Sequence, residues 1–492
     1  MVPSTHSSNS LLLPAALAGM VLLGICLAAI SPQFAHDQAV PMGWIGPLVG
    51  ILSAMGLLYL LMARRIVTDA FPISPPLLVT GLVCGLILRL AMMPSVPVLE
   101  NDHYRYLWDG AVTMQGLNPY APVPAQILTG PEPLASLGKE SGSVLPRINH
   151  PDLRTVYPPV AQVFFALAHM LSPFQEVGLR LVLFAAELTT LLLILTLLRR
   201  MDLPSSYSLL YWLNPVVLKE VGNSLHMDAL VPPFVLGALL LAHRRHLYGA
   251  TGLLVGAVGL KIWPVLLLPL ILRASAISIS DAVRALLLFS AGCLLLATPV
   301  WMAGLNSSSG FTAYAGQWEM NNGLSLVLIE LARWLSGLTD GQLHPRLVFG
   351  AIAGAVLLLL VLRLTLRPVT QLPDLVGRAL AICAALFLIS PTQFPWYALW
   401  FFPLLALCPV PALLIYTLTL PLYYLRFLYQ PLGMATVFDH WIVWIEHGPI
   451  LVLLAAAGWK YRASWVLFPR LTKESRPTAP LSPLQAIGGN TP

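Results

Sequence analysis

Repeated apolar runs of membrane length constrain this chain more than any other feature. A helix needs about 20 apolar residues to cross a bilayer. The runs lie near residues 11–30, 44–63, 75–93, 177–198, 206–222, 229–242, 249–272, 284–301, 347–363, 376–390, 397–427 and 443–459. Because 57% of the residues are hydrophobic and only 10% are charged, we predict an all-α polytopic membrane protein.

Clustered basic residues set the expected orientation of these runs. The clusters are Arg64/Arg65, Arg199/Arg200, Arg244/Arg245, Arg363/Arg367/Arg378 and Lys460/Arg462. Lys and Arg are concentrated on the cytoplasmic side of membrane proteins, so an even number of spans separates each pair of clusters. This rule predicts a bundle of about 12–14 transmembrane helices, with residues 100–176, 223–228, 302–346, 391–396 and about 428–442 on the other side.

The same rule assigns three ambiguous runs. Residues 158–172 are too short to cross, so we predict an amphipathic helix on the outer membrane surface. The run 249–272 is interrupted by "KIWP" from Lys261 to Pro264, which predicts two short half-spans. The run 397–427 holds two short spans, with the turn at "CPVP" from Cys408 to Pro411.

The expected domain organisation has three parts. Residues 1–70 hold the first two helices, 71–465 hold the remaining spans and the long loop, and 466–492 form a polar, Pro-rich, disordered cytoplasmic tail. No Lys or Arg precedes the first apolar run, so we expect an uncleaved helix rather than a signal peptide. The five cysteines all lie in apolar runs, which predicts neither a disulfide framework nor a metal site.

Several charged residues are expected on the non-cytoplasmic side, where the positive-inside rule does not explain them. They therefore need another explanation. The stretch "LENDHYRYLWDG" (99–110) follows a span directly and begins the longest hydrophilic loop. Asp102 and Asp228 both lie at the outer ends of helices, where they can share one site. Lys261 lies within an apolar run, and a charge there marks a functional site by default. We interpret it as a phosphate partner, with a snorkelling lysine as the alternative.

Several other candidates have equally plausible structural roles. Asp109 is a substrate-binding residue or else a helix cap or Arg partner, and His226 is a substrate-binding residue or a satisfied polar residue near an interface. The outward aromatic residues either stack on a sugar ring or form the interfacial belt found in any membrane protein. They are Tyr104, Tyr106, Trp108, Tyr120, Tyr157, Trp301, Trp318, Trp396 and Tyr397.

Carboxylates, cations and aromatic rings at one membrane surface suit a lipid-linked phosphosugar. Cations stabilise the departing phosphate, and one carboxylate removes the proton from the attacking hydroxyl. A phosphate leaving group needs no general acid. A single direct displacement inverts the anomeric carbon. Since no basic stripe is present, the net charge of +6 does not indicate nucleic-acid binding.

The stretch "ENDHYRYLWDGAVTMQGLNPYAPV" resembles the first external loop of GT-C membrane glycosyltransferases. It is most similar to bacterial polyprenyl-phosphate-mannose-dependent mannosyltransferases. Later segments resemble the same family in order over about residues 80–460: "PRINHPDLRTVYPPVAQ", "WLNPVVLKEVGNSLHMDAL", "GLKIWPVLLLPL", "WEMNNGLS" and "SPTQFPWYALWFFPLL". The resemblance implies a GT-C-like bundle whose long first external loop carries juxtamembrane helices, and it makes the first two spans an addition.

The resemblance also implies residue roles. Asp102 occupies the position of the catalytic base, and Asp228 matches the second-loop acid that orients the acceptor or Asp102. Asn101 stands where the family carries a further acid, so a metal site is not expected, and no cofactor is implied. The expected substrate-binding residues are Glu100, Tyr104, Arg105, Asp109, Arg147, His150, Tyr157, His226, Lys261, Trp318, Glu319, Gln393, Trp396 and Tyr397.

The predicted activity is therefore an inverting transfer of a sugar, mannose by resemblance, from a polyprenyl-phosphate donor. The acceptor is a lipid, glycan or protein hydroxyl. The predicted location is a bacterial inner membrane with the site facing the periplasm. A transporter or flippase of lipid-linked sugars is the first alternative, although no internal repeat or midplane polar site is evident. A non-catalytic scaffold or sensor is the second.

Overall fold

The computed structural model describes residues 6–36, 39–68, 73–306, 308–317, 319–338 and 343–460. Within these ranges the chain forms helices and no strand, and one isolated parallel bridge joins Met320 to Thr392. The predicted all-α polytopic class is therefore confirmed. The predicted disordered tail (466–492) and Trp318 lie outside the described residues.

Eight of the helices exceed 17 residues, and they form the frame of the bundle. They are α1 (His6–Ile30), α2 (Met42–Thr68), α3 (Pro75–Met92), α7 (Glu176–Arg200), α13 (Ile279–Ala303), α16 (Pro345–Leu366), α17 (Leu372–Ile389) and α23 (Val443–Lys460). Basic residues close α2 at Arg65 and α7 at Arg199 and Arg200, as expected for helix ends in the cytoplasm.

The described residues hold nine helices that can cross a membrane by length and composition, or ten with one bent pair. This is fewer than the 12–14 spans expected, because several apolar runs fold into short, broken helices. The bent pair is Pro215–Asn223 and Met227–His243, with an angle of 105° at the break. The run interrupted by "KIWP" forms α11 (Leu247–Val258), η7 (Trp263–Leu267) and α12 (Leu268–Ser275), each too short to cross alone.

The break predicted at "CPVP" is present. Short helical turns η8 (Pro395–Trp400) and α18 (Phe402–Leu405) precede it. A continuous apolar segment, Pro411–Tyr429, follows and contains α19 (Pro411–Leu414), α20 (Tyr416–Thr419), η9 (Leu420–Leu425) and α21 (Arg426–Tyr429). Two further turns, α22 (Ala435–Val437) and η10 (Phe438–Ile442), lead into α23.

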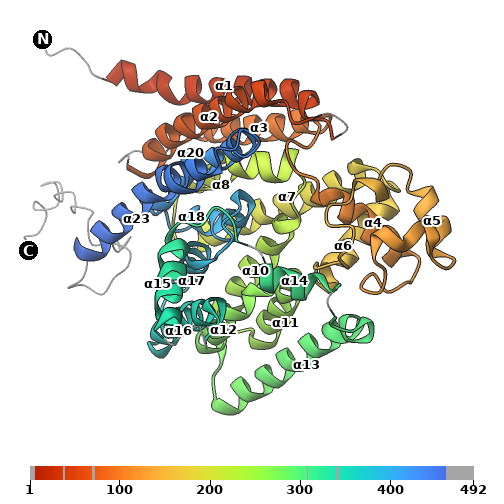
Figure 1. The fold of residues 1–492 in the computed structure, drawn as a ribbon. Coiled ribbons are helices and arrows are strands. Elements are labelled where there is room, and N and C mark those ends of the chain that lie inside the picture. Colours follow the sequence, from red (N-terminus) through yellow and green to blue (C-terminus); the bar gives the residue numbers. More distant parts are fainter. Residues whose placement is uncertain are drawn as a thin grey trace, which may run out of the picture.

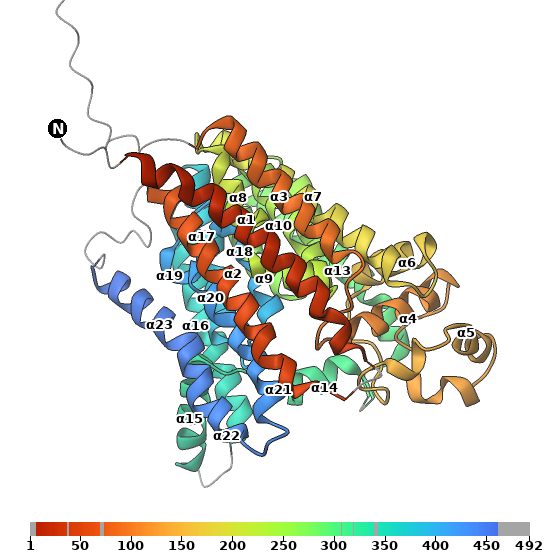
Figure 2. The same cartoon turned by 90° about the horizontal axis from the view of Figure 1, so that it is seen from above.

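The loop predicted to be external, residues 100–176, forms a compact helical unit at one end of the bundle (Figures 1 and 2). It contains α4 (Asp102–Met114), η2 (Pro124–Thr129), α5 (Leu134–Glu140), η3 (Leu145–Arg147) and α6 (Pro159–Leu171). Gly110 of α4 faces the backbone carbonyl of Phe165 in α6 so closely that any side chain there would clash. The 13-residue length of α6 confirms a helix too short to cross, and its position on the membrane surface stays a prediction.

The two N-terminal helices pack into the bundle rather than standing apart. Figures 1 and 2 show α1, α2 and α3 side by side along one edge. The Tyr59 hydroxyl of α2 donates a hydrogen bond of 2.7 Å to the carbonyl of Leu210 in α8 (Leu209–Trp212). The α2 helix also packs against α20 and η9. The expected division at residue 70 stays a prediction.

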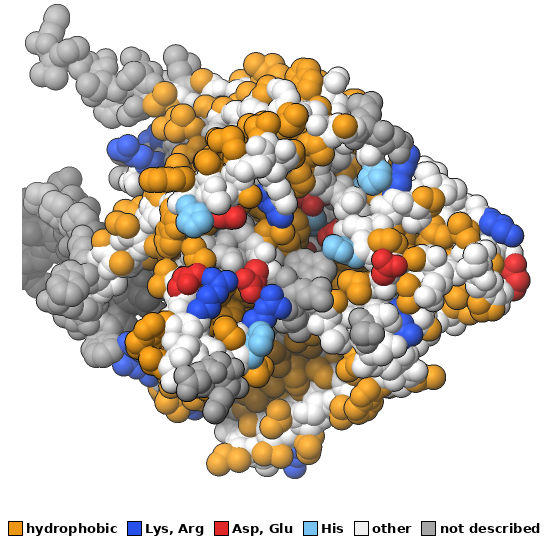
Figure 3. Space-filling model, viewed as in Figure 1, with side chains coloured by type: hydrophobic (Ala, Val, Ile, Leu, Met, Phe, Trp, Pro, Cys, Tyr) orange, Lys and Arg blue, Asp and Glu red, His pale blue; other side chains and the backbone are white. Residues whose placement is uncertain are grey.

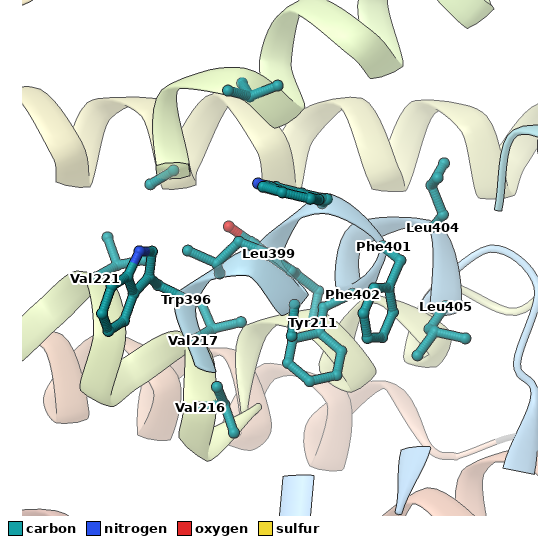
Figure 4. Close-up of a cluster of buried hydrophobic side chains, with 14 of the residues drawn as sticks. Tyr211, Val216, Val217, Val221, Trp396, Leu399, Phe401, Phe402, Leu404 and Leu405 are labelled. Atoms are coloured by element: carbon teal, nitrogen blue, oxygen red, sulfur yellow. The ribbon is translucent and has the colours of Figure 1, made fainter. Parts of the chain in front are cut away.

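The centre of the bundle is built from broken helices rather than long ones. Figure 4 shows η8 and α18 lying beside α9 (Pro215–Val217) and the π-helical turn η5 (Leu218–Asn223). Trp396 faces Val217 and Val221 there, and Phe401 and Phe402 lie beside Tyr211. This buried apolar cluster therefore packs the short helices of the two segments against each other.

The remaining elements complete the bundle. η1 (Ser31–Phe34) extends α1, and η4 (Ser205–Ser208) precedes α8. η6 (Met227–Leu230) leads into α10 (Val231–His243). The predicted external loop 302–346 contains two helices that the sequence analysis did not anticipate, α14 (Gly310–Gln317) and α15 (Leu324–Gly337).

One buried ion pair joins α3 to α7 inside the bundle. The Arg89 Nη2 atom lies 2.6 Å from Glu187 Oε1, and both side chains are at most 2% exposed. Arg89 also donates hydrogen bonds to the carbonyls of Gly85 and Trp212, and its guanidinium lies 3.5 Å from the Trp212 ring centroid. Removing one partner of such a pair leaves an uncompensated buried charge.

We therefore expect Arg89→Met to lower the free energy of unfolding by about 3–5 kcal/mol. The double variant Arg89→Met/Glu187→Leu removes both charges and should recover most of that loss. Unfolding of the purified protein in detergent measures both effects. A double variant as unstable as the single one would instead assign the stability to the hydrogen bonds that Arg89 donates to the backbone.

Candidate active site

A cavity of about 560 Å³ lies between the first external loop and the broken helices. Its size is in the range of small-molecule sites in proteins. Figure 3 shows acidic and basic side chains together near the middle of this face of the molecule, beside hydrophobic surface. The predicted residues that line the cavity are Glu100, Asp102, Arg105, His150, Tyr157, Asp228, Lys261, Trp396 and Tyr397.

Asp102 is the first residue of α4, at the mouth of this cavity. A carboxylate in the first turn interacts favourably with the helix dipole. The Asn149 side-chain amide donates a hydrogen bond of 2.7 Å to Asp102 Oδ1 and one of 3.0 Å to Asn101 Oδ1. Asn149 therefore holds the Asp102 carboxylate in one orientation, with lone pairs left over to accept a proton from a substrate.

Asp228 and Lys261 form an ion pair in the cavity wall. Lys261 Nζ lies 3.1 Å from Asp228 Oδ1, and the Trp400 indole donates a hydrogen bond of 2.8 Å to the same oxygen. The Lys261 ammonium also lies 4.5 Å from the Tyr397 ring centroid. Two residues that the sequence placed in separate roles are thus in direct contact. The ammonium has three donor hydrogens, so it can hold a second anion as well.

The two carboxylates meet around one tyrosine. Tyr106 lines the cavity from α4 and packs against Tyr157, with ring centroids 4.8 Å apart. Burial, the Tyr157 hydroxyl, and the charges of Asp102 and Asp228 all raise the pKa of Tyr106, in that order. Asp102 and Asp228 both line this cavity, so the structure brings together the two acids that the sequence placed at the ends of separate helices.

Aromatic rings form the apolar side of the cavity. Trp396 and Tyr397 come from η8, and Phe394 stacks on Trp396 with centroids 4.2 Å apart. The hydroxyls of Tyr314 and Tyr397 lie 2.7 Å apart and join α14 to η8. Flat apolar faces beside polar groups suit the faces of a sugar ring and the start of a lipid chain.

Arg105 acts on the loop that covers Asp102. Its Nη2 atom donates hydrogen bonds to the carbonyls of His150 (3.1 Å) and Leu153 (3.0 Å). Arg154 similarly donates 2.7 Å to the carbonyl of Ala303 at the end of α13. Both guanidinium groups therefore donate hydrogen bonds to backbone carbonyls. These bonds hold residues 149–154 in place at the cavity.

Glu100 reaches the cavity from the turn between α3 and α4. Its Oε2 atom lies 3.9 Å from His226 Nε2, and its buried Oε1 has no hydrogen-bond partner among the described residues. Burial raises the pKa of Glu100 well above its usual range, while the nearby Lys219 charge opposes this. The carboxyl group thus favours its protonated form, in which it can donate a hydrogen bond to a substrate.

Three residues beside the cavity hold left-handed backbone conformations that side chains rarely adopt. They are Leu99 (φ 61°), His150 (φ 48°) and Leu225 (φ 63°). Such conformations cost about 1–3 kcal/mol each and persist only where surrounding contacts impose them. They lie next in sequence to Glu100, Asn149 and His226, of which Glu100 contacts His226 and Asn149 contacts Asp102.

The other predicted residues lie outside the cavity lining. The ring of His226 stacks on Trp396 behind the wall, with centroids 3.9 Å apart. Arg147 donates a hydrogen bond to the Tyr104 hydroxyl, and Glu319 pairs with Arg346 at 3.4 Å. Gln393 is buried and donates to the carbonyls of Leu388 and Ser390.

Asp109 also supports the site rather than lining it. It is buried and accepts a hydrogen bond of 3.4 Å from Gln162 of α6. Burial raises the pKa of Asp109 to about 6, against the lowering effects of Arg105 and of hydrogen bonds from Thr155 and Gln162. The geometry therefore favours a structural role for Asp109: it lies near the Arg105 charge and joins α4 to α6.

Several lining residues were missed in the substrate-binding prediction. They are Asn149, Tyr314, Met320, Phe394, Trp400, Tyr423 and Arg426. Asn149, Phe394 and Trp400 lie within segments that resemble the family, but nothing in those segments singled them out. The missed residues are ordinary side chains whose role depends on how the chain breaks meet. Across the described ranges, no group of three or more His, Cys, Asp or Glu side chains is placed to hold a metal ion.

The family described as "Alpha-(1->6)-mannopyranosyltransferase, N-terminal domain" matches residues 20–277. The match begins inside α1 and ends beyond α12, so it contains Asp102, Asp228 and Lys261. Curated proteins and solved structures give no match.

The pKa of Asp109 predicts a pH-dependent contribution to stability. The folded state binds this proton more tightly than the unfolded chain, whose carboxyl titrates near 3.8. The contribution is therefore full below about pH 3.8 and is lost as the pH rises through about 6. We expect Asp109→Asn to gain stability relative to the wild type between pH 4 and pH 7. Unfolding of both proteins across this range measures the difference, and a constant difference would contradict the assignment.

Proposed function

Since the chain belongs to the alpha-(1->6)-mannopyranosyltransferase family, we propose that its cavity transfers mannose from a polyprenyl-phosphate donor to an acceptor hydroxyl. The chain is a membrane-embedded mannosyltransferase. One observation carries the finer proposal: a single cavity holds an oriented carboxylate, an ammonium group and aromatic faces.

Asp102 is the proposed base. It removes the proton from the acceptor hydroxyl, whose oxygen attacks the anomeric carbon of the mannosyl donor. The bond from that carbon to the phosphate oxygen breaks, and its electron pair leaves with polyprenyl phosphate. One displacement inverts the anomeric carbon, so an α-linked product requires a β-linked donor. Asn149 serves as a positioning residue because it fixes the Asp102 carboxylate.

Lys261 is the proposed phosphate partner. Its ammonium is held by Asp228 at 3.1 Å and keeps two donor hydrogens for a phosphate oxygen. Positive charge fixed beside the leaving oxygen stabilises the negative charge that develops there. Asp228 then contributes to the reaction by keeping the Lys261 ammonium in position. It can also contact the acceptor.

The proposed sugar contacts come from the remaining lining residues. Trp396 and Tyr397 offer ring faces, and Glu100 offers an unpartnered buried carboxyl oxygen. His150 and Tyr157 line the same space. The acceptor, which is a lipid, a glycan or a protein, is left open because nothing about the cavity selects among them.

We place the cavity on the non-cytoplasmic face of a bacterial inner membrane. The C-terminal ends of α7 and α10 lie together, since Arg200 and Arg244 both act on His243. The cavity lies at the opposite end of the segment that leads into α10, because Asp228 of η6 lines it. The positive-inside rule then supports a site away from the cytoplasm.

The first experiment is mannose transfer by purified protein in lipid. With radiolabelled polyprenyl-phosphate mannose and a mixed membrane-lipid acceptor pool, we expect Asp102→Asn to lower the rate by a factor of about 10²–10⁴. Glu140→Gln, which removes an exposed acid of α5, is the matched control. A parallel reaction in EDTA should keep its activity.

Transfer that survives Asp102→Asn would remove the base assignment. Donor movement across the bilayer without any transfer would favour the transporter alternative.

Lys261→Gln tests the phosphate contact. Loss of a charge-assisted hydrogen bond of about 1.5–3 kcal/mol should raise KM for the donor roughly 10- to 150-fold. Steady-state kinetics with donor and acceptor varied separately measures this, with Lys139→Gln on the exposed face of α5 as the control. A change in KM for the acceptor alone would move Lys261 to the other substrate.

A further inference from the structure

A second polar cluster lies behind the cavity wall, where the loop 319–323, the loop 390–393 and the start of α23 meet. Oxygen atoms dominate it, and they are buried without a hydrogen-bond partner among the described residues. These atoms are Asn321 Oδ1, Asn322 Oδ1, Ser325 Oγ, Gln393 Oε1 and Glu446 Oε2. Buried polar atoms in native proteins are almost always satisfied, so such a group of oxygens calls for an occupant.

Direct contacts bring Asn321, Gln393 and Glu446 together, and Ser325 follows two residues after Gly323, which lies among them. The Asn321 side-chain amide donates 2.7 Å to Glu446 Oε1 and 3.0 Å to the Gln393 carbonyl. Gly323 lies between them: a Cβ there would be 3.0 Å from Gln393 Oε1 and 2.6 Å from His447 Cγ. The glycine therefore keeps open a space that any other residue would fill.

The donor set has the chemistry of a hard cation site. Amide, hydroxyl and carboxylate oxygens are the ligands of such ions. Glu446 and His447 are fully buried, and burial disfavours an ionised Glu446 carboxylate unless a positive charge lies beside it. His447 Nδ1 lies 2.9 Å from the Tyr416 hydroxyl, and burial disfavours its charged form. One carboxylate balances one positive charge, so a monovalent ion leaves the buried site neutral and a divalent ion does not.

We propose that Asn321, Ser325, Gln393 and Glu446 bind a sodium ion. The proposed site does not include the reacting groups, but it lies next to the cavity wall. Met320 and Phe394, the neighbours of Asn321 and Gln393, both line the cavity wall. The Met320 and Gln393 backbones also exchange a hydrogen bond of 3.0 Å, donated by Gln393 N. The ion thus joins two loops and a helix that carry part of this wall.

Thermal unfolding of the purified full-length protein in detergent tests the site without relying on transferase activity. We expect the melting temperature to rise saturably with NaCl when choline chloride keeps the ionic strength constant. Identical melting in both salts would overturn the proposal and leave water or a proton on Glu446 as the occupant. Stabilisation by CaCl2 with none by NaCl would overturn the monovalent assignment.

Substitutions show whether the sodium-dependent rise in melting temperature comes from this site. Ser325→Ala removes one oxygen without removing any hydrogen bond that the described residues make, so it should fold and raise the NaCl concentration at half-saturation. Glu446→Gln should abolish the sodium dependence. Tyr211→Phe removes another buried unpartnered oxygen outside the cluster, and it should respond to NaCl as the wild type does. If Glu446→Gln does not fold, an unchanged sodium response in Ser325→Ala would still contradict the site.

Discussion

Arg180 of α7 holds together the two chain breaks on which the cavity depends. Its guanidinium donates hydrogen bonds to the carbonyls of Met92 (2.9 Å), Gly222 (2.7 Å) and Ser95 (2.5 Å), and it pairs with Glu176 at 3.0 Å. Asn223 adds a second link, because its side chain bonds to the segment 95–98 on both its donor and acceptor sides. The end of α3 and the end of η5 are thus fixed to each other. Glu100 and Asp102 follow the first of these ends, and Asp228 follows the second.

This arrangement explains why a membrane protein places so many broken helices around its centre. A continuous helix satisfies its own backbone and offers only side chains to a substrate. Breaks at residues 223–227, 259–262 and 390–394 free the chain to turn, and each break carries a residue of the cavity or lies beside one. Each break leaves backbone N–H and C=O groups without a partner in a helix, and some residues there adopt left-handed conformations. Both need stabilising contacts. Buried side chains such as Asn223, Arg105 and Gln393 supply these contacts by bonding to the backbone.

Positioning residues outnumber the residues proposed to react. Asn149 orients Asp102, Trp400 and Lys261 share one oxygen of Asp228, and Asp109 joins α4 to α6. An oriented carboxylate beside a paired ammonium suits one displacement at a phosphate-bearing carbon. Membership of the mannosyltransferase family agrees with this chemistry. The proposed sodium site extends the same principle, since it would fix the loops behind Met320 and Phe394.

The sequence by itself determined the membrane class, the helical fold, the long hydrophilic segment 100–176 and the breaks at "KIWP" and "CPVP". The length of an apolar run, the position of basic residues and the presence of proline are local properties of the sequence, so their effects do not depend on which distant segments meet. It also singled out Asp102, Asp228 and Lys261, because charges in apolar surroundings are conspicuous. Only the tertiary structure decided that Asp228 and Lys261 pair, that Arg105 bonds to a loop, and that His226 and Gln393 lie behind the wall. Only it placed Asn149, Trp400 and Tyr314 in the cavity. These assignments depend on contacts across as many as 172 residues of separation, and neither composition nor spacing records which distant segments meet.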